Sequence, residues 1–127
     1  MTERRLLQCT IALCGLVPFA AGLSGIIYGA NFLVTDFDIS TDSHIRYLSG
    51  LLLGIGLGFW STLAHIEKHT ERFLVLTLIV FAGGLARLGS LLTLGCPGKS
   101  MQAALVMELV VTPLLCLWQR RIASKTV

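Results

Sequence analysis

Two charged residues, Arg87 and Glu108, lie inside stretches of sequence that are otherwise apolar. Arg87 falls within residues 73–94 and Glu108 within residues 101–118. An arginine at the centre of a membrane-spanning helix costs about 2.5–3.5 kcal/mol to insert, so such a residue marks a functional or pairing site. What these residues can do depends on whether their side chains meet.

The depths of the two charges predict that they meet. Arg87 lies seven residues before Leu94, and Glu108 lies seven residues after Met101. At 1.5 Å per residue, each is roughly 10 Å inside the same boundary of the bilayer. The short connection between the two stretches, residues 95–100, makes antiparallel neighbours of them. We therefore expect a direct or water-bridged ion pair.

Two interpretations of this pair stay open. In the first, each charge makes the other tolerable and the pair fixes the register of two helices, without evidence of net stabilisation. In the second, the pair lines a polar pocket that binds a ligand head group or a proton. Glu108 is then the candidate catalytic residue, as proton donor or acceptor. The sequence does not decide whether the protein is an enzyme.

Four more residues are candidates for ligand binding at the same side of the bilayer. Ser90 follows Arg87 by one helical turn, and the others precede or begin the second apolar stretch: Asp42, His44 and Arg46. The ordinary interpretation of Arg46 is an arginine that extends its charged end to the interface. The ordinary interpretation of His44 is a hydrogen-bonded residue at a helix start.

The composition indicates an integral membrane protein. Of 127 residues, 54% are hydrophobic and 13% are charged, whereas soluble domains have about 25% charged residues. The apolar stretches are long enough to span a bilayer, and a segment in hydrocarbon must satisfy its backbone as a helix. We predict one domain, residues 1–127, that is all-α: an antiparallel, up-down four-helix bundle with transmembrane helices at residues 6–28, 45–64, 73–94 and 101–118.

The basic residues predict the orientation and the partners. Seven lie on one side of the four predicted spans and only Lys99 lies in a connection on the other: Arg4, Arg5, Lys68, Arg72, Arg120, Arg121 and Lys125. By the positive-inside rule, both termini are cytoplasmic. The net charge of +3 therefore indicates contact with membrane lipids and not with nucleic acid.

Motifs for metals, cofactors and phosphate are lacking in the sequence. The four cysteines form no C-x-x-C pair, so we expect neither a disulfide framework nor a metal site. No phosphate-binding loop, nucleophile elbow or H-E-x-x-H occurs, and no cofactor is expected. Glycines recur at every fourth position, as Gly50, Gly54 and Gly58, which predicts close helix packing on that face.

Several patterns together resemble a known family. They are D-S-H-I-R-Y-L-S-G at residues 42–50, G-G-L-A-R-L-G-S at residues 83–90, and M-E-L-V-V-T-P-L-L-C-L-W-Q-R-R at residues 107–121. They resemble the small bacterial membrane proteins catalogued as domain of unknown function 4345, over nearly the whole chain. The family often has two prolines in a row in its fourth helix, whereas here Thr112 precedes Pro113. The resemblance implies a four-helix inner-membrane protein and no established activity.

Three functions fit these features. The first is a structural or accessory membrane protein that binds a larger membrane complex or forms a homo-oligomer. The second is a binding protein or enzyme for a lipid, quinone, isoprenoid or sterol-like molecule, whose head group Arg46 and Arg87 would hold. The third is a small proton-coupled transporter, but the first apolar stretch carries no charge, which counts against it.

Overall fold

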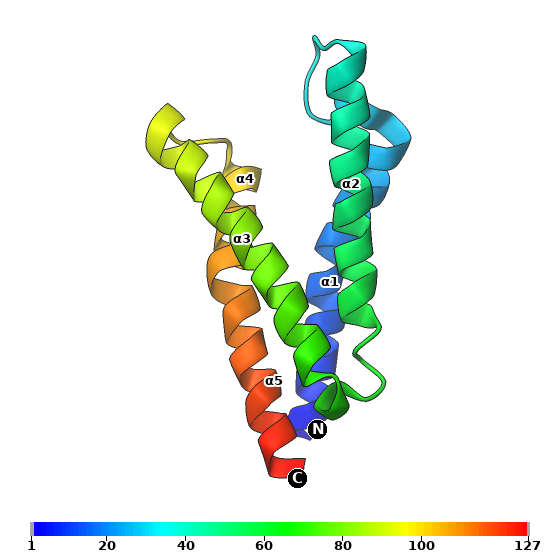
Figure 1. Ribbon diagram of the computed structural model, residues 1–127, viewed down its shortest axis with the longest axis vertical. Coiled ribbons are helices and arrows are strands. Elements are labelled where there is room, and N and C mark those ends of the chain that lie inside the picture. Colours follow the sequence, from blue (N-terminus) through cyan, green and yellow to red (C-terminus); the bar gives the residue numbers. More distant parts are fainter. Residues whose placement is uncertain (1, 127) are drawn as a thin grey trace. The chain divides into compact units, whose positions relative to one another are not determined.

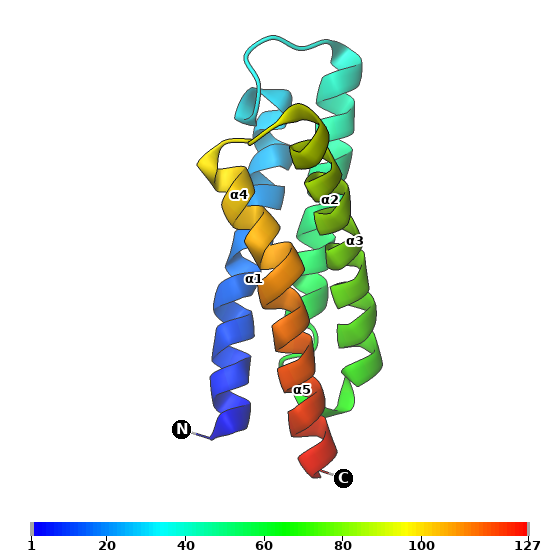
Figure 2. The ribbon, with the colours of Figure 1, turned by 90° about the vertical axis from the view of Figure 1, so that its left-hand side faces the viewer.

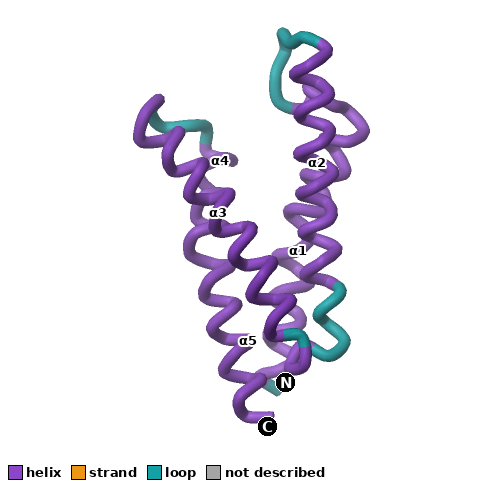
Figure 3. Tube along the Cα trace, viewed as in Figure 1, coloured by secondary structure: helices purple, strands orange, loops and turns teal. Residues whose placement is uncertain are grey.

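The chain is almost entirely helical in the computed structural model, which describes residues 2–126 (Figures 1 and 3). The α-helices are α1 (Glu3–Tyr28), α2 (Ile39–Trp60), α3 (Thr70–Leu94), α4 (Lys99–Val106) and α5 (Thr112–Thr126). Two 3-10 turns, η1 (Gly29–Phe32) and η2 (Ile66–Lys68), precede α2 and α3. The π-helical segment η3 (Met107–Val111) joins α4 to α5 into one continuous helix. The prediction of an all-α chain with four helices is thus confirmed.

Three of the four helices are long and apolar enough to cross a membrane. They span Glu3–Phe32, Thr70–Leu94 and Lys99–Thr126. The fourth predicted span falls on α2, which is not among these three. The reason lies in its first two turns, which are rich in polar residues: Ser40, Thr41, Asp42, Ser43, His44 and Arg46. Only the second half of α2 is continuously apolar or glycine.

The chain divides into two compact units. The α1–α2 unit comprises Gln8–Ala64, and the α3–α5 unit comprises Met1–Leu7 with His65–Val127. Within the α3–α5 unit, α3 runs beside the continuous helix formed by α4, η3 and α5 (Figures 1 and 2).

α1 and α2 approach each other closely at glycines, but in α2 these are not the predicted ones. A Cβ on Gly22 of α1 would lie 2.8 Å from the carbonyl oxygen of Ser49, and one on Gly56 of α2 would lie 3.3 Å from the backbone of α1. Gly50 and Gly54, in contrast, face open space. Residues two apart are about 200° apart around a helix, so Gly54 and Gly56 cannot share a face.

A buried glutamine organises the core of the α3–α5 unit. Gln119 of α5 is 0% exposed, and its Nε2 donates to the Ile66 carbonyl at 2.7 Å and to Thr70 Oγ1 at 2.9 Å. Buried amides are hydrogen-bonded because an unpaired polar group costs free energy without water. Phe73, which is fully buried, lies in the same first turn of α3. Gln119 thus fixes α5 to η2 and to the start of α3.

Ion pairs at the same end tie the first turn of α1 into this unit. Glu3 contacts Lys125 Nζ at 2.8 Å and Arg121 Nε at 3.7 Å, and Arg4 Nε lies 3.1 Å from Glu67 Oε2. The two pairs of Glu3 are exposed, so each contributes little to stability, whereas the side chain of Glu67 is only 13% exposed.

Candidate functional site

Gly84 allows α3 to lie close to η3 just before Arg87. Gly84 is buried, and a Cβ added there would lie 2.8 Å from Leu109 Cδ2 and 2.9 Å from Glu108 Cβ. Carbon atoms in normal contact are about 3.5–4.0 Å apart, so a side chain at this position would push the two helices apart. Because Arg87 lies one turn further along the same helix, this close approach brings Glu108 within its reach.

The π-helical segment that carries Glu108 has an identifiable cause. Pro113 has no N–H and its ring clashes with the carbonyl four residues before it in a regular α-helix. In the structure, the N–H of Thr112 reaches back five residues to the Met107 carbonyl, and Thr112 Oγ1 donates to the same carbonyl at 2.8 Å. The wider turn accommodates the proline, and Glu108 lies within it. Segments of this kind are frequent at functional sites.

Arg87 and Glu108 form a two-point ion pair between α3 and η3. Arg87 Nε lies 3.0 Å from Glu108 Oε2, and Nη2 lies 3.1 Å from Oε1. This parallel arrangement is the strongest form of arginine–carboxylate bonding. The side chains are 35% and 19% exposed, respectively. The pair is therefore electrically neutral as a whole and only partly enclosed.

Met101 is the third member of this cluster. It lies in the first turn of α4, and its Sδ accepts a hydrogen bond from Arg87 Nη1 at 2.9 Å. A thioether sulfur is a weak acceptor compared with a carboxylate or carbonyl oxygen. The guanidinium is thus held strongly on its Glu108 side and weakly on its Met101 side.

The structure does not bring Ser90 into this cluster. Ser90 is exposed, and its carbonyl oxygen accepts a hydrogen bond from the Thr93 hydroxyl at 3.3 Å. Within the α3–α5 unit, the described side chains that bond to Arg87 are those of Glu108 and Met101.

Asp42 and Arg46 lie in the α1–α2 unit, where they close the end of α1. Arg46 Nε donates to Asp42 Oδ2 at 2.8 Å, one helical turn apart on α2. The Arg46 Nη1 group donates to the carbonyls of Ile26 and Ile27, while Asp42 Oδ1 accepts from the N–H of Ala30 at 2.8 Å. A cation near the last carbonyls of a helix is favourable because those groups lack partners and carry partial negative charge.

Glycine at position 29 makes room for this arrangement. Gly29 adopts a φ of 59° at the end of α1, a conformation that glycine reaches without steric cost. A Cβ there would collide with the carboxylate of Asp42 and lie 2.7 Å from Arg46 Nη2. Asp42 and Arg46 are therefore explained as the cap of a helix.

The charge environment of Asp42 favours its ionised form. The hydrogen bond from the Arg46 guanidinium, together with that from the N–H of Ala30, lowers the pKa of the Asp42 carboxyl. At the start of the same helix, the hydrogen bonds from Thr41 lower the pKa of Asp38. Asp38 is the N-cap of α2, and its carboxylate accepts from the Thr41 N–H at 2.8 Å.

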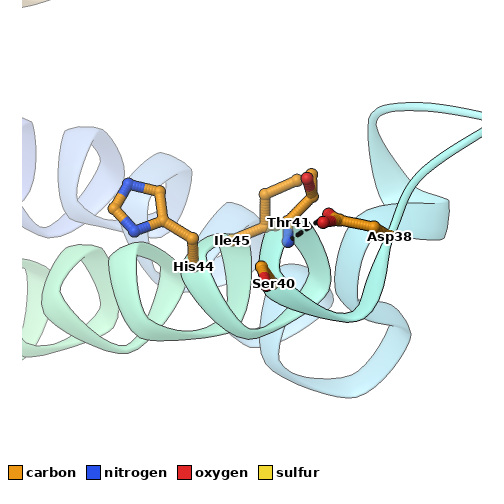
Figure 4. A pocket seen from close by; sticks show the side chains of 5 residues that line it. All are labelled: Asp38, Ser40, Thr41, His44 and Ile45. Carbon is orange, nitrogen blue, oxygen red and sulfur yellow. Dashed lines mark hydrogen bonds between the residues drawn. The ribbon is translucent and has the colours of Figure 1, made fainter.

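His44 is exposed and lines a shallow, open depression on the first two turns of α2. The depression is lined by Asp38, Ser40, Thr41, His44 and Ile45. Figure 4 shows the imidazole of His44 and the carboxylate of Asp38 at opposite ends of it, with Asp38 bonded to Thr41. The arrangement is that of a helix start with one exposed histidine.

Residues 2–126 contain no cluster of three or more histidine, cysteine, aspartate or glutamate side chains placed to hold a metal ion. All four cysteines are free thiols; Cys9 and Cys96 are exposed, and Cys116 is buried.

Sequence reasoning missed three contributors to the cluster around Arg87. Gly84, Met101 and the π-helical form of residues 107–111 were not predicted. Signals in the sequence point to two of these three contributors. Thr112 before Pro113 in the middle of an apolar stretch signals a local change of helix, and Gly84 lies one turn before the only arginine of its stretch. Met101 carries no such signal, because a methionine at a helix start is ordinary.

Comparison with protein-family models gives a match over residues 6–119, to the model described as Domain of unknown function (DUF4345). No curated protein and no solved structure matches the chain.

Proposed function

The chain belongs to the DUF4345 family, and from its residues and geometry we propose that it is a four-span protein of a bacterial inner membrane. In this proposal the helices cross in alternating directions as an antiparallel bundle, and both termini are cytoplasmic. The distribution of lysine and arginine supports this orientation, because seven of them lie on the cytoplasmic side, whereas on the outer side Lys99 lies in a connection and Arg46 at the interface. The polar first turns of α2 then lie at the outer interface.

Cys96 offers a direct test of this orientation. It is exposed in the connection between α3 and α4, which lies on the outer side in the proposal. A membrane-impermeant maleimide added to intact cells should label the wild type, and the Cys96→Ser variant should lose this label. Labelling of Cys96 only after the membrane is permeabilised would contradict the proposed orientation.

Within the membrane, we propose an accessory role in which the protein binds a larger membrane protein or further copies of itself. The supporting observation is that glycines on the spans face open space, namely Gly50 and Gly54 of α2 and Gly83 and Gly89 of α3. Small residues on a helix surface let another helix come close, which is the main source of helix association in lipid. The Arg87–Glu108 pair fixes α3 against η3 and so fixes one of these surfaces.

Bulky side chains on the open glycines test this role. Gly83→Ile and Gly54→Ile have space for the new side chain within their own units, so the helical content should not change. Native mass spectrometry after gentle solubilisation should then show that the mass of the wild-type assembly falls to that of the single chain. An assembly mass that stays unchanged in both variants, or a single chain in the wild type, would contradict the accessory role.

A second candidate function, the binding of an amphiphilic small molecule, is favoured by the contact between Arg87 and Met101. The Arg87 side chain is 35% exposed, and its guanidinium, which is bonded to sulfur on one side, has donors available for a better acceptor. An amphiphile in the bilayer could supply this acceptor while its tail stays in the lipid.

This second candidate is tested by small molecules that copurify with the protein. Mass spectrometry should detect one specific amphiphile that the wild type retains and the Glu108→Gln variant loses, because this variant removes the charge that orients Arg87. Equal amounts of bulk lipid on both proteins would contradict amphiphile binding and leave the ion pair with its structural role.

A further inference from the structure

The hydrogen bonds of Arg87 define what kind of head group fits beside it. A guanidinium has five N–H donors. Two bond to the oxygens of Glu108 and one bonds to the sulfur of Met101. Within the α3–α5 unit, the two other N–H groups, one on Nη1 and one on Nη2, have no described acceptor. The open part of the site is therefore made of donors.

The charge of the site limits the ligand further. Glu108 already neutralises Arg87 through two hydrogen bonds of 3.0 and 3.1 Å. A second anion would leave one net negative charge in the apolar span, and a cation would leave one net positive charge, each of which is costly there. A neutral acceptor adds no charge. A carbonyl oxygen has two lone pairs and no donor of its own, so it complements a surface that offers only donors.

Met101 occupies the place that such an oxygen would take. Its sulfur is a weak acceptor, and its unbranched side chain has three rotatable bonds, so it can move aside at little cost. Replacing the sulfur by a carbonyl oxygen strengthens the bond from Nη1 without disturbing the two bonds to Glu108.

We propose that Arg87, held by Glu108, binds the carbonyl oxygen of a neutral amphiphile, which displaces the sulfur of Met101 from Nη1. This inference rests on the second candidate function above and specifies its ligand class. Both a fatty ester and an isoprenoid-type quinone carry the required oxygen. The tail of either would lie along the lipid-exposed surface of the span.

The test compares probes that differ in their head groups. Delipidated full-length protein in dodecyl maltoside, a detergent without a carbonyl, is titrated with methyl dodecanoate, sodium dodecanoate and dodecane, and binding is followed by ligand-observed NMR. We expect methyl dodecanoate to bind at least tenfold more tightly than dodecanoate or dodecane, the effect of a hydrogen bond to a charged group. The infrared stretching frequency of the ¹³C-labelled carbonyl group of methyl dodecanoate should fall on binding. Decylubiquinone is a fourth probe. Tighter binding of methyl dodecanoate would identify an ester as the source of the carbonyl, and tighter binding of decylubiquinone would identify a quinone.

Two substitutions of Met101 decide whether the sulfur is displaced. Met101→Gln places an amide oxygen beside Nη1, which should satisfy it internally and weaken binding of methyl dodecanoate about tenfold. Met101→Leu keeps the size but removes the sulfur, so binding should be as tight as in the wild type or tighter. Circular dichroism shows whether each variant keeps its helical content. If Met101→Gln loses helical content, the Met101→Leu variant and the series of probes still decide whether the sulfur is displaced.

The outcomes separate the inference from the function on which it rests. Tighter binding of dodecanoate than of its methyl ester would overturn the neutral-carbonyl inference and leave amphiphile binding standing. Loss of binding in Met101→Leu, or unchanged binding in a folded Met101→Gln variant, would overturn the displacement of the sulfur. No binding of any probe would overturn both the inference and amphiphile binding.

Discussion

Two of the arginine–carboxylate pairs in residues 2–126, Arg46–Asp42 and Arg87–Glu108, differ in what they hold together. Arg46 and Asp42 lie on one helix, and their remaining hydrogen bonds go to backbone groups at the end of α1. Arg87 and Glu108 lie on different helices, and the remaining bond goes to a sulfur atom. The first pair caps the end of a helix, whereas the second joins two helices and has a weakly accepting thioether as its third partner.

The largest effect is expected from removing one charge of the Arg87–Glu108 pair. Glu108→Leu leaves a guanidinium without a counter-charge in an apolar span. Loss of one partner of a fully buried pair costs about 3–5 kcal/mol, and because this pair is only partly enclosed, we expect a loss of about 2–3 kcal/mol. Unfolding in mixed micelles, followed by circular dichroism, measures this loss. The double variant Arg87→Leu/Glu108→Leu should recover most of the stability, because no charge is then unpaired. A stability of Glu108→Leu equal to that of the wild type would show that the pair is not held as described.

The second effect concerns the close approach at Gly84. Gly84→Ala introduces a Cβ within 3 Å of Glu108 and Leu109, and overpacking of this kind costs about 1–3 kcal/mol. Gly83→Ala is the matched control, since Gly83 faces open space one residue earlier, and its helix propensity should leave stability equal or slightly higher. The same unfolding measurement applies. If Gly84→Ala and Gly83→Ala lost equal stability, the close helix packing at Gly84 would not be the cause of the loss.

A smaller effect, dependent on pH, is expected from the Asp42–Arg46 pair. The pKa of Asp42 is lowered in the folded protein, so its contribution is present above the ordinary aspartate pKa, about 3.9. The contribution is lost as the pH falls through the lower folded-state pKa. Asp42→Asn should therefore be less stable than the wild type near neutral pH, and the difference should disappear in strong acid. A stability difference that does not change with pH would contradict the role of the carboxylate.

The sequence predicts the elements of this protein better than their contacts. Four helices and the family follow from the apolar stretches and from the local patterns, and both are confirmed. Equal depths place Arg87 and Glu108 at one level, and the structure has them 3.0 Å apart. Depth is a simple count along a helix, which is why it can be read from sequence.

Which side of a helix faces its neighbour is harder to predict than the position of a residue along the helix. The glycine spacing in α2 predicts a packed face at Gly50 and Gly54, yet α1 packs against Gly56. The π-helical turn that accommodates Pro113 contains Glu108, and the Asp42–Arg46 pair bonds to backbone groups at the end of α1. Which face of α2 packs against α1 depends on the rotation of one helix against the other, which a single sequence does not specify.

The measurement that tests the account most directly is a double-mutant cycle on Arg87→Gln and Glu108→Gln, with stability determined by unfolding in mixed micelles. Glutamine has the size of glutamate and places an uncharged polar group at both positions, so the cycle measures the coupling that is lost with the ion pair. Because the two charges form a two-point pair between helices, we predict a coupling energy of about 2 kcal/mol, within the range for residues in direct contact. Additive effects of the two substitutions, within about 0.3–0.5 kcal/mol, would show that Arg87 and Glu108 act independently and would contradict the account.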